Sequence, residues 1–492
     1  MSSSGAMILR RCLLPSVILV PLFVSGCLDV EYVPTDTGDA RDTAEDAADV
    51  PDISQDTAAL DTRDVATDST PSDTADTADS CQPTNNGREI CDDVDNDCDG
   101  ETDERTNCLF VVKLPETHQA RAVSVDMKGE YAYVAGNVPE SKSAPKGQTD
   151  IFVSKFDMSG QEKWTETLRS PGEDNLNDIE MLSGMVTLVG RTGGDLHGAS
   201  KNTAGEDGFI ATLSSQGMDA KVGYLGTKDS GDIPDVDSDE ILATVGNHSP
   251  MNGNVFGSMT VFDPNNLSIA WSKDKKLQGS QLKYRRVSNT GSRIWVLSQT
   301  QPMEKFHFHL TLYDGLDETE KSTKMDVVST SYYEEIGFDA DKNGPVICGS
   351  TNSNIGGPNA GAWDAFVVKF DGNMSRSWSR QLGSQKTERC IDVRAHRQGF
   401  FVSGYTTGKL KNSSALGRAD AFLARYDRTA NLSWVRTLGG PGSDQPRSFS
   451  IADDKAIGCL LAESDGPFEG LEAPSSVDQK ALICMDLNPA GK

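Results

Sequence analysis

The stretch WDAFVVKFDGNMSRSWSRQLGSQKTERCIDVRAHRQGFFVSGYTTG, residues 363–408, decides the fold because it recurs along the chain. A second copy, RADAFLARYDRTANLSWVRTLGGPGSDQPRSFSIADD, begins at Arg418, and an earlier one, QTDIFVSKFDMSGQEKWTETLRSPGEDNLNDIEMLSGMVTLVGRTGG, begins at Gln148. Each copy alternates apolar and polar residues between Gly, Asn and Asp, which predicts short strands joined by turns. A repeat of this size is one supersecondary unit that the chain uses several times.

Four strands are expected in the first of these copies. The first is Ala365–Phe370, and the second contains Trp378 and reaches Leu382. The third runs from Cys390 to Ala395, and the fourth is Phe400–Gly404. Four strands in about 50–57 residues predict one blade of a β-propeller.

The period of the repeat is set by an aspartate at the end of its first strand. Steps between these markers run from 49 to 59 residues, and residues 207–351 fit the pattern less well. The markers are Asp157, a position near Ser214, Asp263, Asp314, Asp371, Asp427 and Asp486. Tryptophans follow seven or eight residues later at Trp164, Trp271, Trp378 and Trp434. We expect them to pack between blades and not to form a sugar-stacking platform.

The two ends of the repeat array complement each other. Asp486 ends a first strand, and only LNPAGK follows it. The array begins with the sequence LFVVKL, residues 109–114, which has no first strand before it. The carboxyl end therefore supplies the strand that the amino end lacks. One composite blade and six whole ones predict an all-β fold, a seven-bladed β-propeller over residues 109–492, whose mixed closure pairs the open sheet edges.

The repeat resembles the bacterial SBBP β-propeller repeat. That pattern runs D-A-F-V-x-K-x-D-x-x-G-x-x-x-W-x-x-x-L-G-G, followed by an aspartate-glycine turn and Y/F-V-x-G-x-T. Residues 150–168, 364–382 and 420–440 match it best. The resemblance implies a propeller and implies little about function, because propellers carry many activities.

Residues 1–26 have the organisation of a secretory signal peptide. Arg10 and Arg11 precede the apolar run Cys12–Val24, which is too short for a comfortable transmembrane helix. The ending VSGC, residues 24–27, resembles the bacterial lipobox, which implies that Cys27 is the lipidated first residue of the mature protein. Acyl chains on Cys27 would anchor the protein stably in a membrane. The alternative is an ordinary signal peptide followed by a chance cysteine.

Residues 27–80 form an acidic segment rich in Asp, Thr and Ala. From Leu28 to Ser80 there are 16 acidic and 2 basic residues, a net charge of −14 within a chain total of −28. Such a composition cannot bury enough apolar area to fold, and like charges keep it extended. We expect a disordered tether between the membrane and the rest of the chain. The chain has no basic nucleic-acid-binding pattern, so no nucleic-acid partner is expected.

Residues 81–108, CQPTNNGREICDDVDNDCDGETDERTNC, combine cysteines with alternating carboxylates. Hard oxygen ligands around a glycine turn suit Ca²⁺. Asp95, Asp97, Asp99 and Gly100 match the first half of an EF-type loop, but the twelfth position is Thr106 instead of a bidentate Glu. The candidate metal ligands are Asp93, Asp95, Asp97, Asp99, Asp103 and Glu104.

The segment EICDDVDNDCDGETDE, residues 89–104, resembles the short metal-binding motif of myxobacterial and other secreted bacterial proteins, grouped with the copper-binding MopE family. The resemblance implies metal binding without settling the metal, so copper or another soft metal is an alternative to Ca²⁺. A disulfide-stapled linker without a metal is the remaining alternative. In an oxidising compartment Cys81, Cys91, Cys98 and Cys108 would form two disulfides with three conceivable pairings.

Few other patterns in the sequence point to chemistry, and no catalytic residue is assigned. His307 and His309 could begin a metal site, although exposed strand positions explain them better. The runs Asp339–Gly344 and Asp235–Glu240 look like Ca²⁺ loops, and the first coincides with a hairpin turn. Two further disulfides are expected among four strand cysteines, with the pairings Cys348–Cys390 and Cys459–Cys484.

Together these features predict an outer-membrane or surface lipoprotein. Its propeller would bind an unknown extracellular protein or glycan at the loop face or central channel. The alternatives are a propeller enzyme that acts on extracellular polysaccharide, which requires paired carboxylates or a metal at the channel, and a purely structural envelope component. An apolar, plugged channel would argue against the enzyme.

Overall fold

The computed structural model describes only part of the chain. The described residues are 98, 108–139, 148–182, 184–200, 205–225, 230–237, 241–249, 255–275, 282–300, 306–315, 318–330, 336–411, 413, 415–466 and 479–488. The chain divides into two compact units, Met1–Asp76 and Thr77–Lys492, and every described residue belongs to the second. None of the described residues forms a helix long and apolar enough to cross a membrane.

The described strands form seven four-stranded antiparallel sheets, which we number as blades 1 to 7. Blade 1 contains β2 (Gln119–Val125), β3 (Tyr131–Pro139), β4 (Thr149–Asp157) and β5 (Glu162–Leu168). Blade 2 contains β6 (Asp174–Leu182), β7 (Met185–Thr192), β8 (Asp207–Ser214) and β9 (Lys221–Tyr224), with the 3-10 turn η1 (Leu196–Gly198) between β7 and β8. Blade 3 contains β10 (Ser230–Asp237), β11 (Leu242–Ser249), β12 (Phe256–Phe262) and β13 (Ile269–Lys275).

The second half of the ring is built in the same way. Blade 4 contains β14 (Lys283–Thr290), β15 (Arg293–Thr300), β16 (Phe306–Asp314) and β17 (Thr319–Thr330). Blade 5 contains β18 (Gly337–Asp341), β19 (Gly344–Thr351), β20 (Asp364–Phe370) and β21 (Arg376–Leu382). Blade 6 contains β22 (Glu388–His396), β23 (Gly399–Thr406), β24 (Asp420–Tyr426) and β25 (Leu432–Leu438). Blade 7 contains β26 (Asp444–Ile451), β27 (Ile457–Ser464), β28 (Gln479–Asp486) and β1 (Cys108–Lys113).

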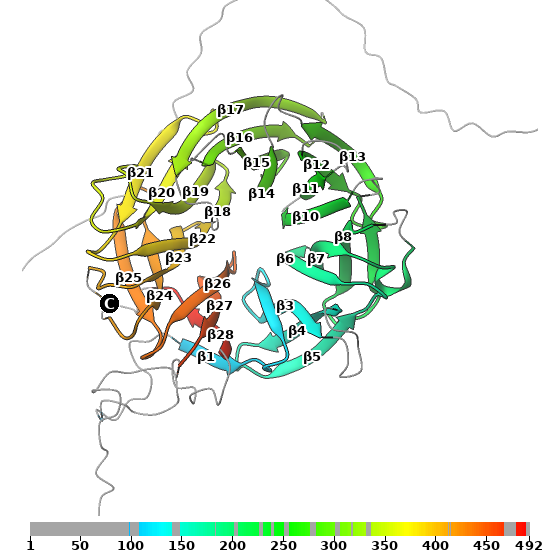
Figure 1. The fold of residues 1–492 in the computed structure, drawn as a ribbon, viewed down its shortest axis with the longest axis horizontal. Coiled ribbons are helices and arrows are strands. Elements are labelled where there is room, and N and C mark those ends of the chain that lie inside the picture. Colours follow the sequence, from blue (N-terminus) through cyan, green and yellow to red (C-terminus); the bar gives the residue numbers. More distant parts are fainter. Residues whose placement is uncertain are drawn as a thin grey trace, which may run out of the picture. The chain divides into compact units, whose positions relative to one another are not determined.

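The seven blades stand around one axis, as Figure 1 shows in a view along it. The first strand of each blade lies nearest the axis and the fourth lies at the rim. The predicted all-β, seven-bladed propeller is confirmed, and residues 207–351, which match the repeat less well, form regular blades too.

Blade 7 closes the ring with strands from both ends of the described array. β1 pairs antiparallel with β28, and Phe110 lies opposite Cys484. The fourth strand of this blade therefore comes from the amino-terminal side, and its first three strands come from the carboxyl-terminal side. The predicted closure by paired strands from both ends is confirmed, but the composition of the composite blade is corrected: the carboxyl-terminal side supplies three strands, instead of the single one expected, and the amino-terminal side supplies one.

The boundary of the sequence repeat differs from the boundary of the blade. The four strands expected in residues 363–408 all exist, as β20 to β23. However, β20 and β21 are the outer half of blade 5, and β22 and β23 are the inner half of blade 6. The prediction that one repeat folds as one blade is thus wrong, because each repeat spans two neighbouring sheets.

The hydrophobic core is divided among the contacts between blades. Seven clusters of buried apolar side chains are found, and each joins the facing surfaces of two neighbouring blades. The tryptophans on the fourth strands contribute to this packing, as predicted. Trp164, for example, packs beside blade 2, where its indole N–H donates to the carbonyl of Ser215.

The periodic aspartates form the turns between the third and fourth strands. In blade 6, Asp427 Oδ1 accepts hydrogen bonds from the backbone N–H groups of Thr429 (2.9 Å) and Asn431 (2.8 Å). Asp157 and Asp371 make the same turn in blades 1 and 5. The markers therefore have a structural role, since a carboxylate acceptor fixes the turn geometry.

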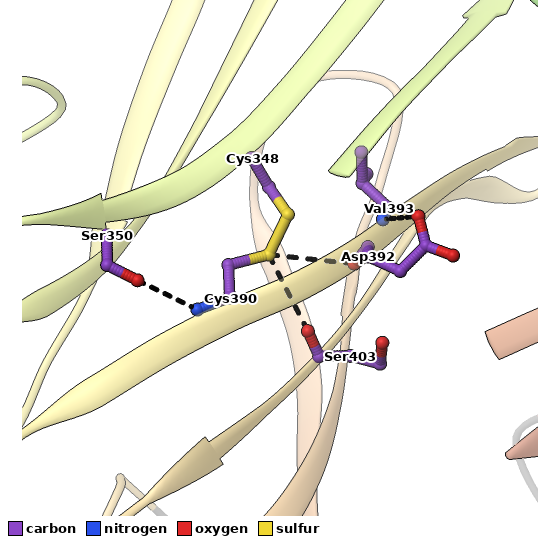
Figure 2. The surroundings of a disulfide bond; sticks show 6 residues. All are labelled: Cys348, Ser350, Cys390, Asp392, Val393 and Ser403. Carbon is purple, nitrogen blue, oxygen red and sulfur yellow. Dashed lines mark hydrogen bonds between the residues drawn. A yellow bond between two sulfur atoms is a disulfide. The ribbon is translucent and has the colours of Figure 1, made fainter. Parts of the chain in front are cut away.

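Both predicted strand disulfides are present. Cys348 of β19 is bonded to Cys390 of β22, with their Cα atoms 6.0 Å apart, so this bridge joins blade 5 to blade 6 (Figure 2). The backbone N–H of Cys390 also donates to Ser350 Oγ of blade 5 at 3.2 Å. Cys459 is bonded to Cys484 within blade 7, next to the strand that closes the ring.

Closure through β1 predicts that Phe110 contributes strongly to stability. Its side chain is 8% exposed and packs in the cluster between blades 7 and 1. We expect Phe110→Ala to lower the free energy of unfolding by about 3–5 kcal/mol in urea titrations, because it removes apolar contact and leaves a cavity. Leu109→Ala is the control, since Leu109 is 39% exposed on the same strand. Equal losses for both variants would contradict closure by this strand.

Candidate functional site

The central channel is lined by the first strand of each blade. Several of these strands contain a register shift, for example between Leu176 and Asp178 in β6 and between Cys390 and Asp392 in β22. Beyond each bulge, alternate residues share one face of the strand. In this way β6, β10, β14 and β22 each direct polar side chains at positions two residues apart toward the axis.

A cavity of about 670 Å³ occupies one end of this channel. Its rim contains exposed Arg121 and Arg447 together with Glu463 and Lys480. Glu463 is paired with Arg447 through Nε (2.8 Å) and with Lys480 through Nζ (3.3 Å). We call this side of the ring the mouth face.

The mouth face carries the long connections of the ring. The described residues 193–200, 352–363 and 407–411, which follow second strands, lie on this side. The opposite side carries tight turns such as 427–431. β1 runs from Cys108 to Lys113 and leads toward Gln119, which lines the cavity at the mouth. Cys108, at the other end of this strand, therefore lies on the side of the ring opposite the mouth.

Charged side chains fill the channel in two tiers. The tier nearer the mouth contains Asp178, Asp235, Arg286 and Asp392. The deeper tier contains Glu180, Asp237, Asp339 and Arg394. Six carboxylates thus face two guanidinium groups, and the channel is neither apolar nor filled by apolar side chains.

Each of the two arginines pairs with one carboxylate. Arg286 pairs within its own tier, and Arg394 pairs with a carboxylate of the tier nearer the mouth. Arg286 Nη1 lies 3.4 Å from Asp235 Oδ1, and Arg394 Nη2 lies 3.2 Å from Asp392 Oδ2. Burial nevertheless raises the pKa of Glu180 to about 8 and that of Asp339 to about 7. Burial also raises the pKa of Asp178 and of Asp235, which share a hydrogen bond. Glu180 and Asp339 therefore titrate near neutral pH.

Polar side chains of the channel also connect each blade to the next. A side chain on one first strand bonds to the backbone or side chain of the neighbouring first strand, and we call each such contact a clamp. The clamps are Ser124–Glu180 (3.4 Å), Asp178–Val236 N (3.4 Å), Asp235–Val287 N (2.7 Å), Ser288–Ala340 N (3.0 Å), Asp339–Ala395 N (2.7 Å), Arg394–Phe449 O (3.0 Å) and Ser448–Val123 N (3.2 Å). All seven junctions have one.

The predicted amino-terminal sites lie outside the described residues, except for Cys98. Cys27, Cys81, Cys91 and the six candidate metal ligands at residues 93–104 are all in this part of the chain. Cys98 is disulfide-bonded. The backbone of Cys108 begins β1, so the cysteine and aspartate segment joins the ring directly at its closing strand.

Two predictions about the ring are corrected. Asp235 and Asp237 lie on strand β10 and accept backbone N–H groups of β14, so they do not form a Ca²⁺ loop; Asp239 and Glu240 are outside the described residues. His309 is 2% exposed and its Nε2 lies 2.8 Å from Thr300 Oγ1, so the exposed position expected for it is wrong.

The turn at Asp341 is confirmed as hairpin chemistry. Asp341 Oδ1 accepts the backbone N–H of Asn343 at 2.9 Å, and its carboxylate pairs with Lys369 and Arg428. Within the described part of the chain, no group of three or more His, Cys, Asp or Glu side chains could hold a metal ion together.

Sequence reasoning missed the channel residues other than Asp235, Asp237 and Asp339. A signal was present, since Asp178 and Glu180 are two residues apart, as are Asp392 and Arg394. Charges at that spacing share one face of a strand. In strands that start a blade, that face is the channel.

Comparison with known proteins identifies no family for this chain. No family model and no curated protein matches the chain. Among solved structures it is similar to the β-propeller domain of the Trilobed protease from Pyrococcus furiosus, at 9% identity over 76% of this chain and 97% of that one, with a TM-score of 0.44. It is also similar to the acylaminoacyl peptidase of Pyrococcus horikoshii, at 10% identity over 72% of this chain and 52% of that one, with a TM-score of 0.43.

A sialidase of Trypanosoma rangeli, in complex with sialic acid, gives 9% identity over 76% of this chain and 57% of that one, with a TM-score of 0.38. The chain spans little more than half the length of this sialidase and of the peptidase. Similarities this distant carry no argument about ligands. The assignment as a seven-bladed propeller rests on the strand pairing itself.

The raised pKa of Glu180 predicts a pH-dependent stability. Its folded pKa of about 8 exceeds the usual 4.5, so the native state retains a proton that the unfolded chain loses. Stability from this group is complete below about pH 4.5 and declines as pH rises toward 8. Glu180→Gln should remove that decline, so its free energy of unfolding at pH 8 should exceed that of the unsubstituted protein by about 1–3 kcal/mol. The expected gain is limited because the side chain is partly open to solvent. Urea titrations from pH 4 to 9 would measure this, with Glu130→Gln as the control because Glu130 is exposed. The prediction is refuted if the free energy of unfolding depends on pH in the same way for the unsubstituted protein and both variants.

Proposed function

We propose that this protein is a lipoprotein of the outer membrane or cell surface whose propeller is a binding module. The observation that carries the proposal is the charged cavity on the mouth face, opposite the side at which the chain enters the ring. The first described strand of the ring begins at Cys108, on the side away from that mouth. The long connections around it are the part of a propeller that varies without cost to the sheets.

The chemistry of the cavity favours a polar ligand. Its rim offers Arg121, Arg447 and Lys480 as donors, and its interior offers carboxylates as acceptors. Apolar pockets suit hydrophobic ligands, whereas this arrangement suits hydroxyl, amine and carboxylate groups. An extracellular glycan or a polar protein loop is therefore the expected partner.

Two further features support an exported protein. Cys348–Cys390 and Cys459–Cys484 are disulfides, which persist in oxidising compartments. The lipobox-like sequence ending at Cys27 supports anchoring by acyl chains. The aspartates of residues 93–104 support a Ca²⁺ site between tether and ring, and the disulfide at Cys98 disfavours that cysteine as a soft-metal ligand.

A polysaccharide-acting enzyme is the second candidate, favoured by the hydrogen-bonded pair Asp178 and Asp235. Both carboxylates, however, accept backbone N–H groups of the next blade, and Asp235 also pairs with Arg286. These contacts hold the ring together and leave the pair less free to exchange protons with a substrate. Binding without turnover is therefore the better proposal.

Anchoring through Cys27 predicts a change in cell fractionation. Cys27→Ser should move the protein from the membrane fraction to the soluble fraction, because the acylation site is lost. Labelled palmitate incorporation should disappear as well. Substitution of Cys12, within the apolar run, serves as the control. Unchanged membrane association of Cys27→Ser would contradict the lipid anchor.

Ligand binding at the mouth predicts that rim arginines set affinity. The double variant Arg121→Glu, Arg447→Glu should weaken capture of glycan-array or purified surface-protein ligands by about tenfold or more. It replaces two cationic hydrogen-bond donors at the entrance of the cavity by anionic acceptors. Lys128→Glu, an exposed change on the opposite side of the ring, should leave capture unchanged. Equal binding by both variants would contradict a site at the mouth. Release of sugar products would favour the enzyme, and no ligand on any array would favour a structural component.

A further inference from the structure

Three arginines of the first strands stand at equivalent bulges of their sheets. In β2, β14 and β26 the pairing with the second strand shifts by one residue, and the extra residue is an arginine in each strand. These residues are Arg121 in blade 1, Arg285 in blade 4 and Arg447 in blade 7. The extra residues in blades 2 and 6 are Asn177 and Ile391. A bulge turns its extra side chain out of the regular alternation of the strand, so these arginines are aimed differently from their neighbours.

All three guanidinium groups are held in the same way. Each Nε donates to a side-chain oxygen on the second strand, opposite the residue two positions before the arginine. The bonds are Arg121 Nε to Asn137 Oδ1 (3.1 Å), Arg285 Nε to Gln299 Oε1 (2.6 Å) and Arg447 Nε to Glu463 Oε2 (2.8 Å). Fixing Nε orients the guanidinium plane, because the donors of an arginine form a rigid fork.

Two of the three arginines line the cavity at the mouth. Arg121 and Arg447 are among its lining residues, whereas Arg285 is not. Their strands are neighbours across the closing junction, where the backbone N–H of Val123 donates to Ser448 Oγ at 3.2 Å. Lys480 lines the cavity as well. Blades 7 and 1 thus present three cationic groups at one sector of the mouth.

The carboxylates of this sector do not cancel its positive charge. Glu463 is shared by Arg447 and Lys480, and Arg447 Nη2 also donates to it. Glu116 lies 3.8 Å from the exposed Lys113. Among the described residues the hydrogen-bond partner of Arg121 is Asn137, which is neutral. The sector therefore keeps an excess of positive charge, with the Nη groups of Arg121 available to an anion.

The interior of the same cavity has the opposite chemistry. Asp235 and Asp392 each accept a backbone N–H and each pair with one guanidinium group. A carboxylate has about four lone-pair sites, so both can accept further donors. An anion would be repelled there, and the two guanidinium groups already supply the cations of this region. Neutral donors such as hydroxyl groups suit it best.

We propose that the mouth binds a sugar acid, with its carboxylate on Arg121 and Arg447 and its hydroxyl groups donating to the carboxylates of the interior. The proposal rests on the binding role proposed for the mouth and specifies the class of ligand. The guanidinium fork matches the planar carboxylate of such a sugar. The cavity of about 670 Å³ has the size of a small-ligand site, so it can take the end of an acidic polysaccharide. An acidic protein segment fits less well, because its further carboxylates would meet the anionic interior.

Calorimetric titration of the purified full-length protein with short galacturonate oligomers tests this. The acid should bind more tightly than the same oligomers as methyl esters by about tenfold or more, because the esters keep the hydroxyl groups and lose the charge. Arg121→Gln and Arg447→Gln should each lower that ratio to about twofold or less. Arg121→Lys should recover part of it, since an ammonium group keeps the charge without the fork.

Arg285→Gln is the matched control. Arg285 has the same bulge and the same Nε bond but does not line the cavity, so this variant should keep the full ratio of acid to ester binding. Melting temperatures of all variants show whether each is folded. Equal losses for Arg285→Gln and Arg121→Gln would overturn the proposal, since the arginines would then act through the sheet.

The proposal is also overturned if acid and ester bind equally tightly, or if neither binds. Tighter binding of glucosamine oligomers or of an acidic peptide would overturn it too, because the ligand would then be a cation or a protein. Failure of this proposal is distinguishable from failure of the binding role. Equal binding of acid and ester that the double variant Arg121→Glu, Arg447→Glu weakens would keep a site at the mouth and remove its preference for an acid.

Discussion

The pairing of β1 with β28 is the constraint on which the ring depends. Each sheet of a propeller packs only against its two neighbours, so an open ring would expose one apolar face at each end. The last blade closes this gap with Phe110, which lies opposite Cys484 in the sheet and packs against the first blade. The disulfide between Cys459 and Cys484 fastens the neighbouring strands of the same sheet, so covalent reinforcement lies where closure is needed.

The first strands impose a second constraint, because each has one edge without a strand partner. Buried backbone N–H groups require acceptors, and five of the seven clamps supply them from the preceding blade, as Asp235 does for Val287 and Asp339 for Ala395. Carboxylates are strong acceptors, which explains why the channel is charged although its surroundings are apolar. The same residues that hold the ring thus make its axis a polar cavity. Structural and binding roles overlap there, whereas neither Arg121 nor Arg447 forms one of the clamps.

Much of this architecture could be predicted from the sequence, because turns and packing repeat. The aspartates at Asp371 and Asp427 mark turns, the tryptophans mark outer strands, and LFVVKL at residues 109–114 completes the blade that ends at Asp486. The boundary of a blade was not predictable, since each sheet forms from adjacent halves of two repeats. The length of a repeat gives the number of strands in a blade but not which strand comes first in the sheet. The channel was missed because charges such as Asp392 and Arg394 look exposed in a strand, and only ring closure makes them converge.

The offset between repeat and blade explains why the junctions carry so much chemistry. Each repeat begins in the outer half of one sheet and ends in the inner half of the next, so residues close in sequence face each other across a junction. Trp363 and Thr387 form a backbone bridge in this way, and Cys390 follows three residues later with its bond to Cys348 of the preceding blade. A substitution within one repeat therefore changes a junction and not a blade.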